Sequence, residues 1–578
     1  MSSRPCLAPH LGALVLASQI AIVSSAGAAS LAPVGAPHAM VVTAQHLATE
    51  VGVEVLRQGG NAIDAAVAVG YALAVVYPAA GNLGGGGFMV VQFADGRRTF
   101  LDFRERAPLA ARADMYLDAR GNVRPGSTTD GWLAVAVPGS VSGLEYAREH
   151  FGTRPAATLL EPAIRLAREG FLLQQGDADI LSVATRDFRA DPATASIFLH
   201  DGEPLAAGDR LIQRDLAVTL ERIRDGGARA FYRGTTAEAI LAASRAGGGI
   251  LAQADFEQYE TRERAPVECD YRGYHVISAP PPSSGGVIVC EILNVLEGYP
   301  LHDLGFRSAQ AVHFQIEAMR HAYFDRNNAL GDPDFVSNPL AHLLDRGYAK
   351  ALRDAIDPSR AAKSSDLANG RAPHEGVNTT HFSILDAQGN AVSVTYTLDE
   401  WFGIHRVAPG TGVLLNDEMD DFTAKVGTPN LFGLVQGERN AIAPGKRPLS
   451  SMSPTIVTRD GKVVMVLGTP GGSRIISTVV HAIVNVIDYG MDIQEAVDAP
   501  RFHQQWEPET TALEPFALSP DTRRLLEGMG HRFTEVRPVN HLAAILVGAP
   551  ALGARPVGLN RVYGANDPRR RTGMALGY

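Results

Sequence analysis

The chain has 578 residues, of which 46% are hydrophobic and 20% are charged, and its formal net charge is −10. A chain of this length and composition forms a large globular protein. Its basic residues are scattered rather than clustered, which excludes a nucleic-acid-binding function, because such a function needs a basic patch.

The first 29 residues have the pattern of an export signal. Arg4 gives a positive start, residues 11–23 are mostly apolar, and residues 26–28 are small, as at a signal cleavage site. The apolar run is too short to cross a bilayer comfortably, and no second long run follows; a retained anchor is the alternative. We therefore expect residues 1–29 to be a signal peptide and the protein to be periplasmic or secreted, without a stable membrane anchor.

Two cysteines remain once the signal peptide, which contains Cys6, has been removed. They are Cys269 and Cys290. In an oxidising compartment they can form a disulfide, but the sequence is equally compatible with two separate buried thiols.

The first part of the exported chain predicts two helices and a glycine-rich loop. Residues 45–60 read as an amphipathic helix, and residues 61–76 as a buried helix capped by Asn61. The loop at residues 79–88 carries a run of four glycines but no following Lys-Ser/Thr, and it leads into a strand. We therefore interpret it as a close approach of backbone beneath a site, not as a phosphate loop.

The long middle of the chain is mainly helical and is expected to cover the sheets. The exception is residues 267–278, a strand pair or one bent strand, followed by the rigid turn PPPSSGG at residues 280–286. A helix over residues 287–299 follows this turn. Residues 366–377 have the composition of a mobile surface segment.

The stretch that opens at Thr379 predicts a β-hairpin, with strands on either side of a turn at residues 386–390. A cut between Asn378 and Thr379 would give the threonine a free α-amine with a pKa of about 7.7–8.0, able to take the hydroxyl proton. The alternative is an ordinary threonine-rich strand, since threonine favours strands.

Several further groups are ordinary when taken singly, but together they form a coherent set of catalytic parts. A second hairpin spans residues 454–468 and ends at TPGG, which leads into a helix. The other candidates are an acidic loop, a serine pair, the glycine pair and a strand-end arginine: Glu418, Asp420, Asp421, Ser450, Ser451, Gly471, Gly472 and Arg104. These supply carboxylates for a cation, donors for an anion and backbone N–H groups for an oxyanion.

Arg104 has two interpretations, a fork that binds a carboxylate and an ion-paired or solvated strand end. The GxSxG and HExxH motifs and zinc-ligand spacing of Cys and His are absent from the sequence. We therefore expect neither a serine triad nor a metal site, and no cofactor.

Ten sequence strings together make the chain closely resemble the γ-glutamyltranspeptidase (glutathione hydrolase) family of N-terminal nucleophile hydrolases. They occur in the family's order over nearly the whole exported chain: GGNAIDAAVA, GNLGGGGFM, FRERAP, PPPSSGG, TTHFS, TYTLD, LLNDEMDDF, RPLSSMSP, GTPGGSR and YGANDPR.

The resemblance implies an α+β protein, a four-layer αββα sandwich with an extra helical region. The resemblance also implies a proenzyme that cuts itself into a large subunit, residues 30–378, and a small subunit, residues 379–578. The activity implied is γ-glutamyl hydrolysis and transfer to an amino acid or dipeptide. The implied roles are nucleophile Thr379, its hydrogen-bonding partner Thr397, oxyanion donors Gly471 and Gly472, α-carboxylate ligands Arg104, Ser450 and Ser451, and α-ammonium ligands Glu418 and Asp421.

Two positions depart from the family's pattern. Asp399 stands where relatives usually carry Asn, which predicts three carboxylates around one ammonium group and a raised apparent pKa. Phe432 stands in the stretch resembling the lid loop, where some relatives have Tyr, so a lid closed by a tyrosine hydrogen bond would lack that bond.

Three alternatives to this function stay open. A related acylase that takes glutaryl amides such as cephalosporin side chains would not need an ammonium pocket. An exported solute-binding protein would neither cut itself nor need Thr379. A relative that fails to mature is the third, because of Asp399.

Overall fold

The two hairpins predicted from alternating residues form the centres of two separate sheets. The computed structural model describes residues 30–364, 379–538 and 540–578. The first hairpin consists of β12 (Thr380–Leu385) and β13 (Ala391–Thr397), and the second of β16 (Thr455–Arg459) and β17 (Lys462–Gly468). Three predicted features lie outside the described residues: the expected signal peptide, the segment 366–377 and the residue before Thr379.

Each hairpin belongs to a seven-stranded sheet in which every neighbouring pair is antiparallel. The first sheet has the order β23 (Met574–Gly577), β2 (Met40–Thr43), β12, β13, β3 (Gly86–Gln92), β4 (Arg98–Phe103) and β9 (Arg262–Arg264). The second has the order β1 (Val34–Ala36), β22 (Val562–Asn566), β21 (Ala543–Val547), β17, β16, β11 (Tyr274–Ser278) and β10 (Val267–Tyr271).

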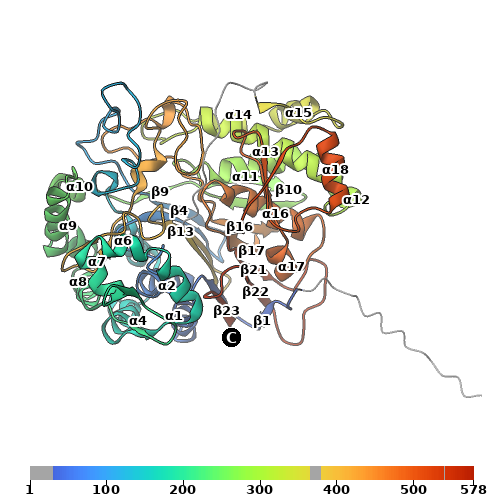
Figure 1. Cartoon of the computed structure of the whole chain (residues 1–578). Helices are drawn as coiled ribbons and strands as arrows, with labels where there is room; N and C mark the ends of the chain where they lie inside the picture. Colours follow the sequence, from blue (N-terminus) through green and yellow to red (C-terminus); the bar gives the residue numbers. More distant parts are fainter. Residues whose placement is uncertain (1–29, 365–378, 539) are drawn as a thin grey trace, which may run out of the picture.

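The sheets stack face to face between two layers of helices, so the predicted αββα sandwich is confirmed (Figure 1). The helices of the layer outside the first sheet are α1 (His46–Arg57), α2 (Ala62–Val76), α3 (Ser140–Phe151), α4 (Ala156–Glu169), α8 (Arg214–Tyr232) and α9 (Thr235–Ala246). Those that cover the second are α11 (Gly285–Leu296), α13 (Ala309–Ala329), α16 (Arg474–Ile487), α17 (Ile493–Asp498) and α18 (Pro520–Gly528).

Shorter elements fill the connections. The helical ones are η1 (Trp132–Ala134), α5 (Gln175–Ser182), α6 (Thr185–Arg189), α7 (Pro192–Phe198), α10 (Gln253–Glu257), α12 (Leu301–Leu304), α14 (Leu340–Leu343), α15 (Arg346–Ala355), η3 (Glu418–Asp421) and η4 (Glu438–Asn440). The short strands are β5 (Phe171–Leu172), β6 (Leu199–His200), β7 (Glu203–Pro204), β8 (Arg210–Leu211), β14 (Val407–Ala408), β15 (Val413–Leu414), β18 (Phe502–His503), β19 (Thr511–Leu513) and β20 (Phe533–Glu535). Within the described ranges, no helix is both long enough and apolar enough to cross a membrane.

Local sequence signals account for the helices next to the first sheet. Asn61 caps α2 through a capping box with Asp64, as the sequence predicts, and every residue of α2 is buried. Residues 267–278 form two paired strands, β10 and β11, which settles the choice between a pair and one bent strand. Cys269 of β10 and Cys290 of α11 form a disulfide, which settles the second open choice and ties the edge of the second sheet to its helical cover.

The ends of seven strands converge on one edge of the sandwich. Because neighbours are antiparallel, the starts of β12 and β3 lie beside the ends of β13 and β4. In the facing sheet the start of β16 lies beside the ends of β17 and β11. Thr379, Arg104, the serine pair and the glycine pair all follow or precede these ends, so residues as far apart in sequence as Arg104 and Gly472 meet there.

The glycine-rich loop lies directly beneath this edge, as predicted. A Cβ on Gly85 would lie 1.9 Å from the carbonyl oxygen of Thr397, and one on Gly84 would lie 2.1 Å from that of Leu414. Asn82 holds the loop in place, because its side chain donates to the Thr397 carbonyl (2.8 Å) and accepts from the Gly85 N–H (2.9 Å). Backbone thus approaches backbone at a distance that only glycine permits.

This contact yields a stability prediction. Gly85→Ala is expected to lower the melting temperature, with a cost of about 1–3 kcal/mol for overpacking against backbone that cannot move aside. The control is Gly528→Ala, where a Cβ meets no atom within 4 Å. Thermal unfolding of both variants checks it, and a wild-type melting temperature for Gly85→Ala would contradict the close approach.

Candidate active site

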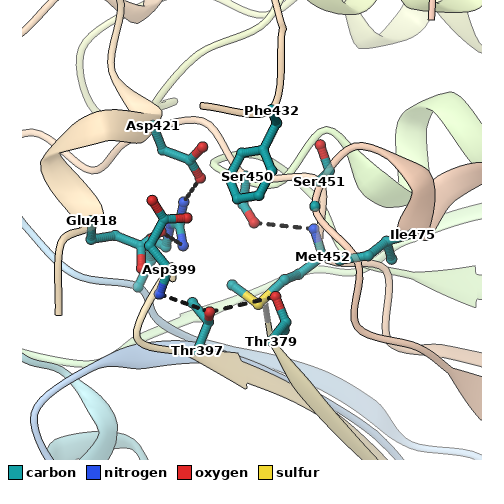
Figure 2. A pocket seen from close by; sticks show the side chains of 12 residues that line it. Thr379, Thr397, Asp399, Glu418, Asp421, Phe432, Ser450, Ser451, Met452 and Ile475 are labelled. Carbon is teal, nitrogen blue, oxygen red and sulfur yellow. Dashed lines mark hydrogen bonds and ion pairs between the residues drawn. The ribbon is translucent and has the colours of Figure 1, made fainter. Parts of the chain in front are cut away.

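Thr379 and Thr397 are brought together by the register of the first hairpin. Thr380 pairs with Tyr396, so the residue that precedes β12 lies beside the residue that ends β13. The Thr397 hydroxyl donates to Thr379 Oγ1 over 3.4 Å and accepts from the N–H of Asp399 over 2.9 Å (Figure 2). The Asp399 N–H therefore turns the proton of Thr397 towards Thr379.

A cavity at this edge is lined by nine of the ten residues expected to react with or bind the substrate, all except Gly471. Its full lining is Arg104, Thr379, Thr397, Asp399, Glu418, Asp421, Phe432, Ser450, Ser451, Met452, Gly472 and Ile475. Figure 2 shows the carboxylates on one side, the serines on the other and Thr379 below them. The site is therefore chemically divided, with acids and hydroxyl donors at separate places.

Arg104 forms ion pairs with Glu418 and Asp421 and is buried with them. Burial alone would lower the pKa of Arg104, but the charges of Glu418, Asp421 and Glu105 outweigh it and raise that pKa. The ion-pair interpretation of Arg104 is thus realised in this structure. Two carboxylates take up its positive charge.

Asp399 adds a third carboxylate to the pair, as the sequence predicts. Ligand atoms of Asp399, Glu418 and Asp421 all lie within 4.8 Å of one another. Burial raises the pKa of Asp399 well above its usual range, and the charges of Asp421 and Glu418 raise it further. One of its carboxylate oxygens is buried and accepts no hydrogen bond from the described residues. Three acids and one arginine leave the site short of positive charge.

The two serines are oriented as donors towards the cavity. Ser450 Oγ accepts from the Met452 N–H (3.1 Å), and Ser451 Oγ accepts from Arg326 Nη2 (2.9 Å). Neither hydroxyl donates to another described residue, so each keeps its proton for a group in the cavity. Ser284, in the PPPSSGG turn, donates to the Ser450 carbonyl from both its N–H (2.8 Å) and its hydroxyl (2.7 Å). That turn therefore holds the serine loop.

Gly471 and Gly472 form a turn that requires glycine at both positions. Their φ angles are +130° and +55°, and a Cβ at Gly472 would lie 2.3 Å from the Phe432 ring. Neither N–H donates a hydrogen bond to another described residue. Gly472 lines the cavity and Gly471 lies beside it, which suits two N–H groups that receive negative charge on a substrate oxygen.

The loop carrying Phe432 closes over this turn without a tyrosine hydroxyl. Asn430 donates to Asp421 Oδ1 (3.1 Å) and accepts from the Phe432 N–H (3.1 Å), and Gln505 donates to the Phe432 carbonyl (3.2 Å). Asp420, part of the predicted acidic set, accepts from the Leu431 N–H (2.8 Å) and braces the loop instead of lining the cavity.

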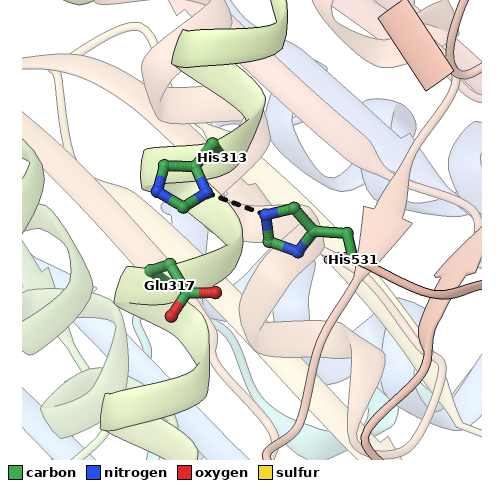
Figure 3. A group of neighbouring side chains, drawn as sticks. All are labelled: His313, Glu317 and His531. Carbon is green, nitrogen blue, oxygen red and sulfur yellow. Dashed lines mark hydrogen bonds between the residues drawn. The ribbon is translucent and has the colours of Figure 1, made fainter. Parts of the chain in front are cut away.

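Two clusters have the composition of metal ligands. In the acidic cluster of the cavity, Arg104 pairs with Glu418 and Asp421. In the second, on the helical side of the other sheet, His313 Nδ1 and His531 Nε2 share a hydrogen bond of 2.8 Å (Figure 3). Glu317 pairs with Arg320 (3.4 Å) and accepts from the Ala362 N–H (3.2 Å). Through the Ala362 contact, the segment that follows α15 is bound to helix α13.

The sequence interpretation missed three residues around the cavity. Met452 and Ile475 line it from strings already singled out, so their neighbours in sequence were a usable signal. Arg326, on α13, reaches Ser451 across 125 sequence positions and had no local signal.

Comparison with known proteins places the chain among relatives over nearly its whole length. A family model described as gamma-glutamyltranspeptidase matches residues 48–577. The chain is 66% identical over 552 residues to a glutathione hydrolase proenzyme of Pseudomonas sp. (strain A14), covering 95% of this chain and 96% of that protein. It is 47% identical over 548 residues to the glutathione hydrolase proenzyme of Escherichia coli (strain K12), covering 94% and 93%.

The fold has a solved counterpart as well. The crystal structure of a cephalosporin acylase from Bacillus halodurans superposes with a TM-score of 0.82 at 27% sequence identity, covering 98% of this chain and 99% of that one.

Proposed function

The chain belongs to the γ-glutamyltranspeptidase family, and we propose that it is a glutathione hydrolase and γ-glutamyltransferase made as a proenzyme. The observation that carries this proposal is the division of the cavity, with carboxylates on one side, serine O–H donors on the other and a threonine hydroxyl below them. A γ-glutamyl group carries an ammonium and a carboxylate on one carbon and an amide carbonyl three carbons away. Its charges and its reacting atom match these three parts of the cavity.

We assign the residue roles by that match. Thr379 is the nucleophile, Thr397 holds its hydroxyl, and the N–H groups of Gly471 and Gly472 receive the oxyanion. The remaining residues bind the two charged groups: the α-carboxylate by Arg104, Ser450 and Ser451, and the α-ammonium by Asp399, Glu418 and Asp421. We propose no metal or cofactor for these steps.

Maturation frees the amine that the reaction needs. We propose a cut between Asn378 and Thr379, which gives a large subunit of residues 30–378 and a small subunit of residues 379–578 that stay associated. The free α-amine of Thr379 then takes the proton of its own hydroxyl. Residues 1–29 act as the signal peptide of an exported, periplasmic or secreted, enzyme.

The reaction proceeds through an ester. Thr379 Oγ attacks the γ-carbonyl carbon, the C–N bond breaks, and the proton held by the α-amine passes to the leaving amine. A γ-glutamyl ester remains on Thr379. Water attacks it to release glutamate, or the amine of an amino acid or dipeptide attacks it to form a new γ-glutamyl peptide.

The acylase alternative is disfavoured by the acids of the cavity. The solved neighbour is a cephalosporin acylase, so the fold alone does not separate the two functions. A glutaryl group has no ammonium, and three clustered carboxylates would then stay buried without a cation beyond Arg104. Comparing kcat/KM for γ-glutamyl and glutaryl anilides tests this choice, and a preference for the glutaryl compound would reverse it.

A first prediction concerns the nucleophile. Thr379→Ala removes the hydroxyl that both cutting and turnover require, so the purified variant should run as one band on a denaturing gel. Wild type should give two bands, with the smaller beginning at Thr379. Release of anilide from a γ-glutamyl anilide should fall by at least about a thousandfold, as for loss of a nucleophile.

The control is Thr380→Ala, whose side chain is buried in the neighbouring position and has no role in the proposal. It should still split and still turn over. Splitting and undiminished turnover by Thr379→Ala would remove the nucleophile from the mechanism.

A second prediction concerns the acid cluster. Because its pKa is raised, Asp399 takes up a proton at a higher pH than an ordinary aspartate does, and the site then loses negative charge for the ammonium. The kcat/KM of wild type should therefore fall over the mildly acidic range. In Asp399→Asn, which lacks this proton, the fall should be smaller, and superimposable pH profiles would rule out Asp399 as its source.

A further inference from the structure

Arg326 is a fully buried arginine without a carboxylate partner. It lies near the end of α13 and forms no ion pair with the described residues. All its hydrogen bonds go to neutral oxygens: Ser284 Oγ (2.9 Å), Ser451 Oγ (2.9 Å), Asn327 Oδ1 (2.9 Å) and Gln436 Oε1 (3.3 Å). Burying a charge without an opposite charge is unfavourable, so Arg326 is suited to an anionic ligand group that binds in the cavity.

The charge of Arg326 is retained despite burial. Burial lowers the pKa of Arg326 to about 10, which still leaves it protonated near neutral pH. Tyr323 and Asp421 favour the charged form of Arg326, and the positive charge of Arg104 opposes it. Arg104 already pairs with Asp421 and Glu418. The positive charge beside the serines that has no ion-pair partner among the described residues is therefore that of Arg326.

The contact with Ser451 transmits this charge to the cavity. Arg326 occupies an acceptor site of the Ser451 hydroxyl, so the hydroxyl proton points elsewhere and is polarised by the guanidinium. A carboxylate that accepts this proton lies one oxygen atom beyond Ser451, within the range of about 4–6 Å over which a charge acts strongly.

We propose that Arg326 is a positioning residue of the α-carboxylate subsite: it fixes the donor direction of Ser451 and supplies a positive charge that Arg104 does not. This inference rests on the proposed γ-glutamyl activity and adds a specificity determinant from α13. The proposal explains why a buried arginine lies between the PPPSSGG turn and the serine pair, where it donates hydrogen bonds to Ser284 and Ser451.

The test compares two substrates that differ only in the α-carboxylate. They are γ-glutamyl anilide and 4-aminobutyryl anilide, which keeps the amine and the amide but lacks the carboxylate. In Arg326→Met we expect KM for γ-glutamyl anilide to rise by about 10- to 100-fold, the effect of losing a charged hydrogen-bond donor, with a smaller change in kcat. The preference for γ-glutamyl over 4-aminobutyryl anilide should fall by the same factor. Arg326→Lys keeps the charge but not the fork, and should recover part of this preference.

The matched control is Arg320→Met, a second buried arginine on the same helix that contacts Glu317 and Ser364 instead of the cavity. It should keep the wild-type preference, whatever its effect on stability. An unchanged preference in Arg326→Met, or an equal loss in both variants, would overturn the proposal. So would a failure of both Arg326 variants to split while the control splits, since Arg326 would then serve folding or cutting. A wild type that releases no γ-glutamyl anilide would instead refute the proposed function itself.

Discussion

The architecture of the site depends on burying opposite charges around one cavity without pairing all of them. Arg104 and the two acids it pairs with are buried together, and such a group is stable only when each member has a partner. Asp399 and Arg326 are the members left over, one negative and one positive, on different sides of the cavity. A zwitterion supplies the missing charge to each, so the same imbalance that costs stability in the free protein favours binding of that class of ligand.

Much of the fold follows from local sequence. The alternation in both hairpins, the cap at Asn61 and the glycine-rich loop each predict what the structure contains, because these signals act over a few residues. The antiparallel edge then explains why distant motifs meet. The disulfide could not be decided from sequence, since it depends on how β10 lies against α11.

The residues that form the site were easier to predict from sequence than the contacts between them. Motifs identified nine lining residues, but the partner of each is set by packing between elements that are far apart in the chain. Arg104 offered a fork for a carboxylate, and its closest carboxylates are those of the protein itself. Arg326 belongs to a helix whose sequence suggests only burial, and its role becomes visible when its neighbours prove to be neutral.

The register of β12 also bears on whether the site would keep its geometry after the proposed cut between Asn378 and Thr379. Strand β12 is central, with β2 on one side and β13 on the other, so its ladders hold Thr380 and the residues after it independently of the chain before Thr379. The hydroxyl of Thr397 and the N–H of Asp399 belong to the same hairpin and move with it. The proposed cut would therefore free an amine without displacing the proposed nucleophile from its partners, because the sheet, and not the chain before Thr379, determines its position.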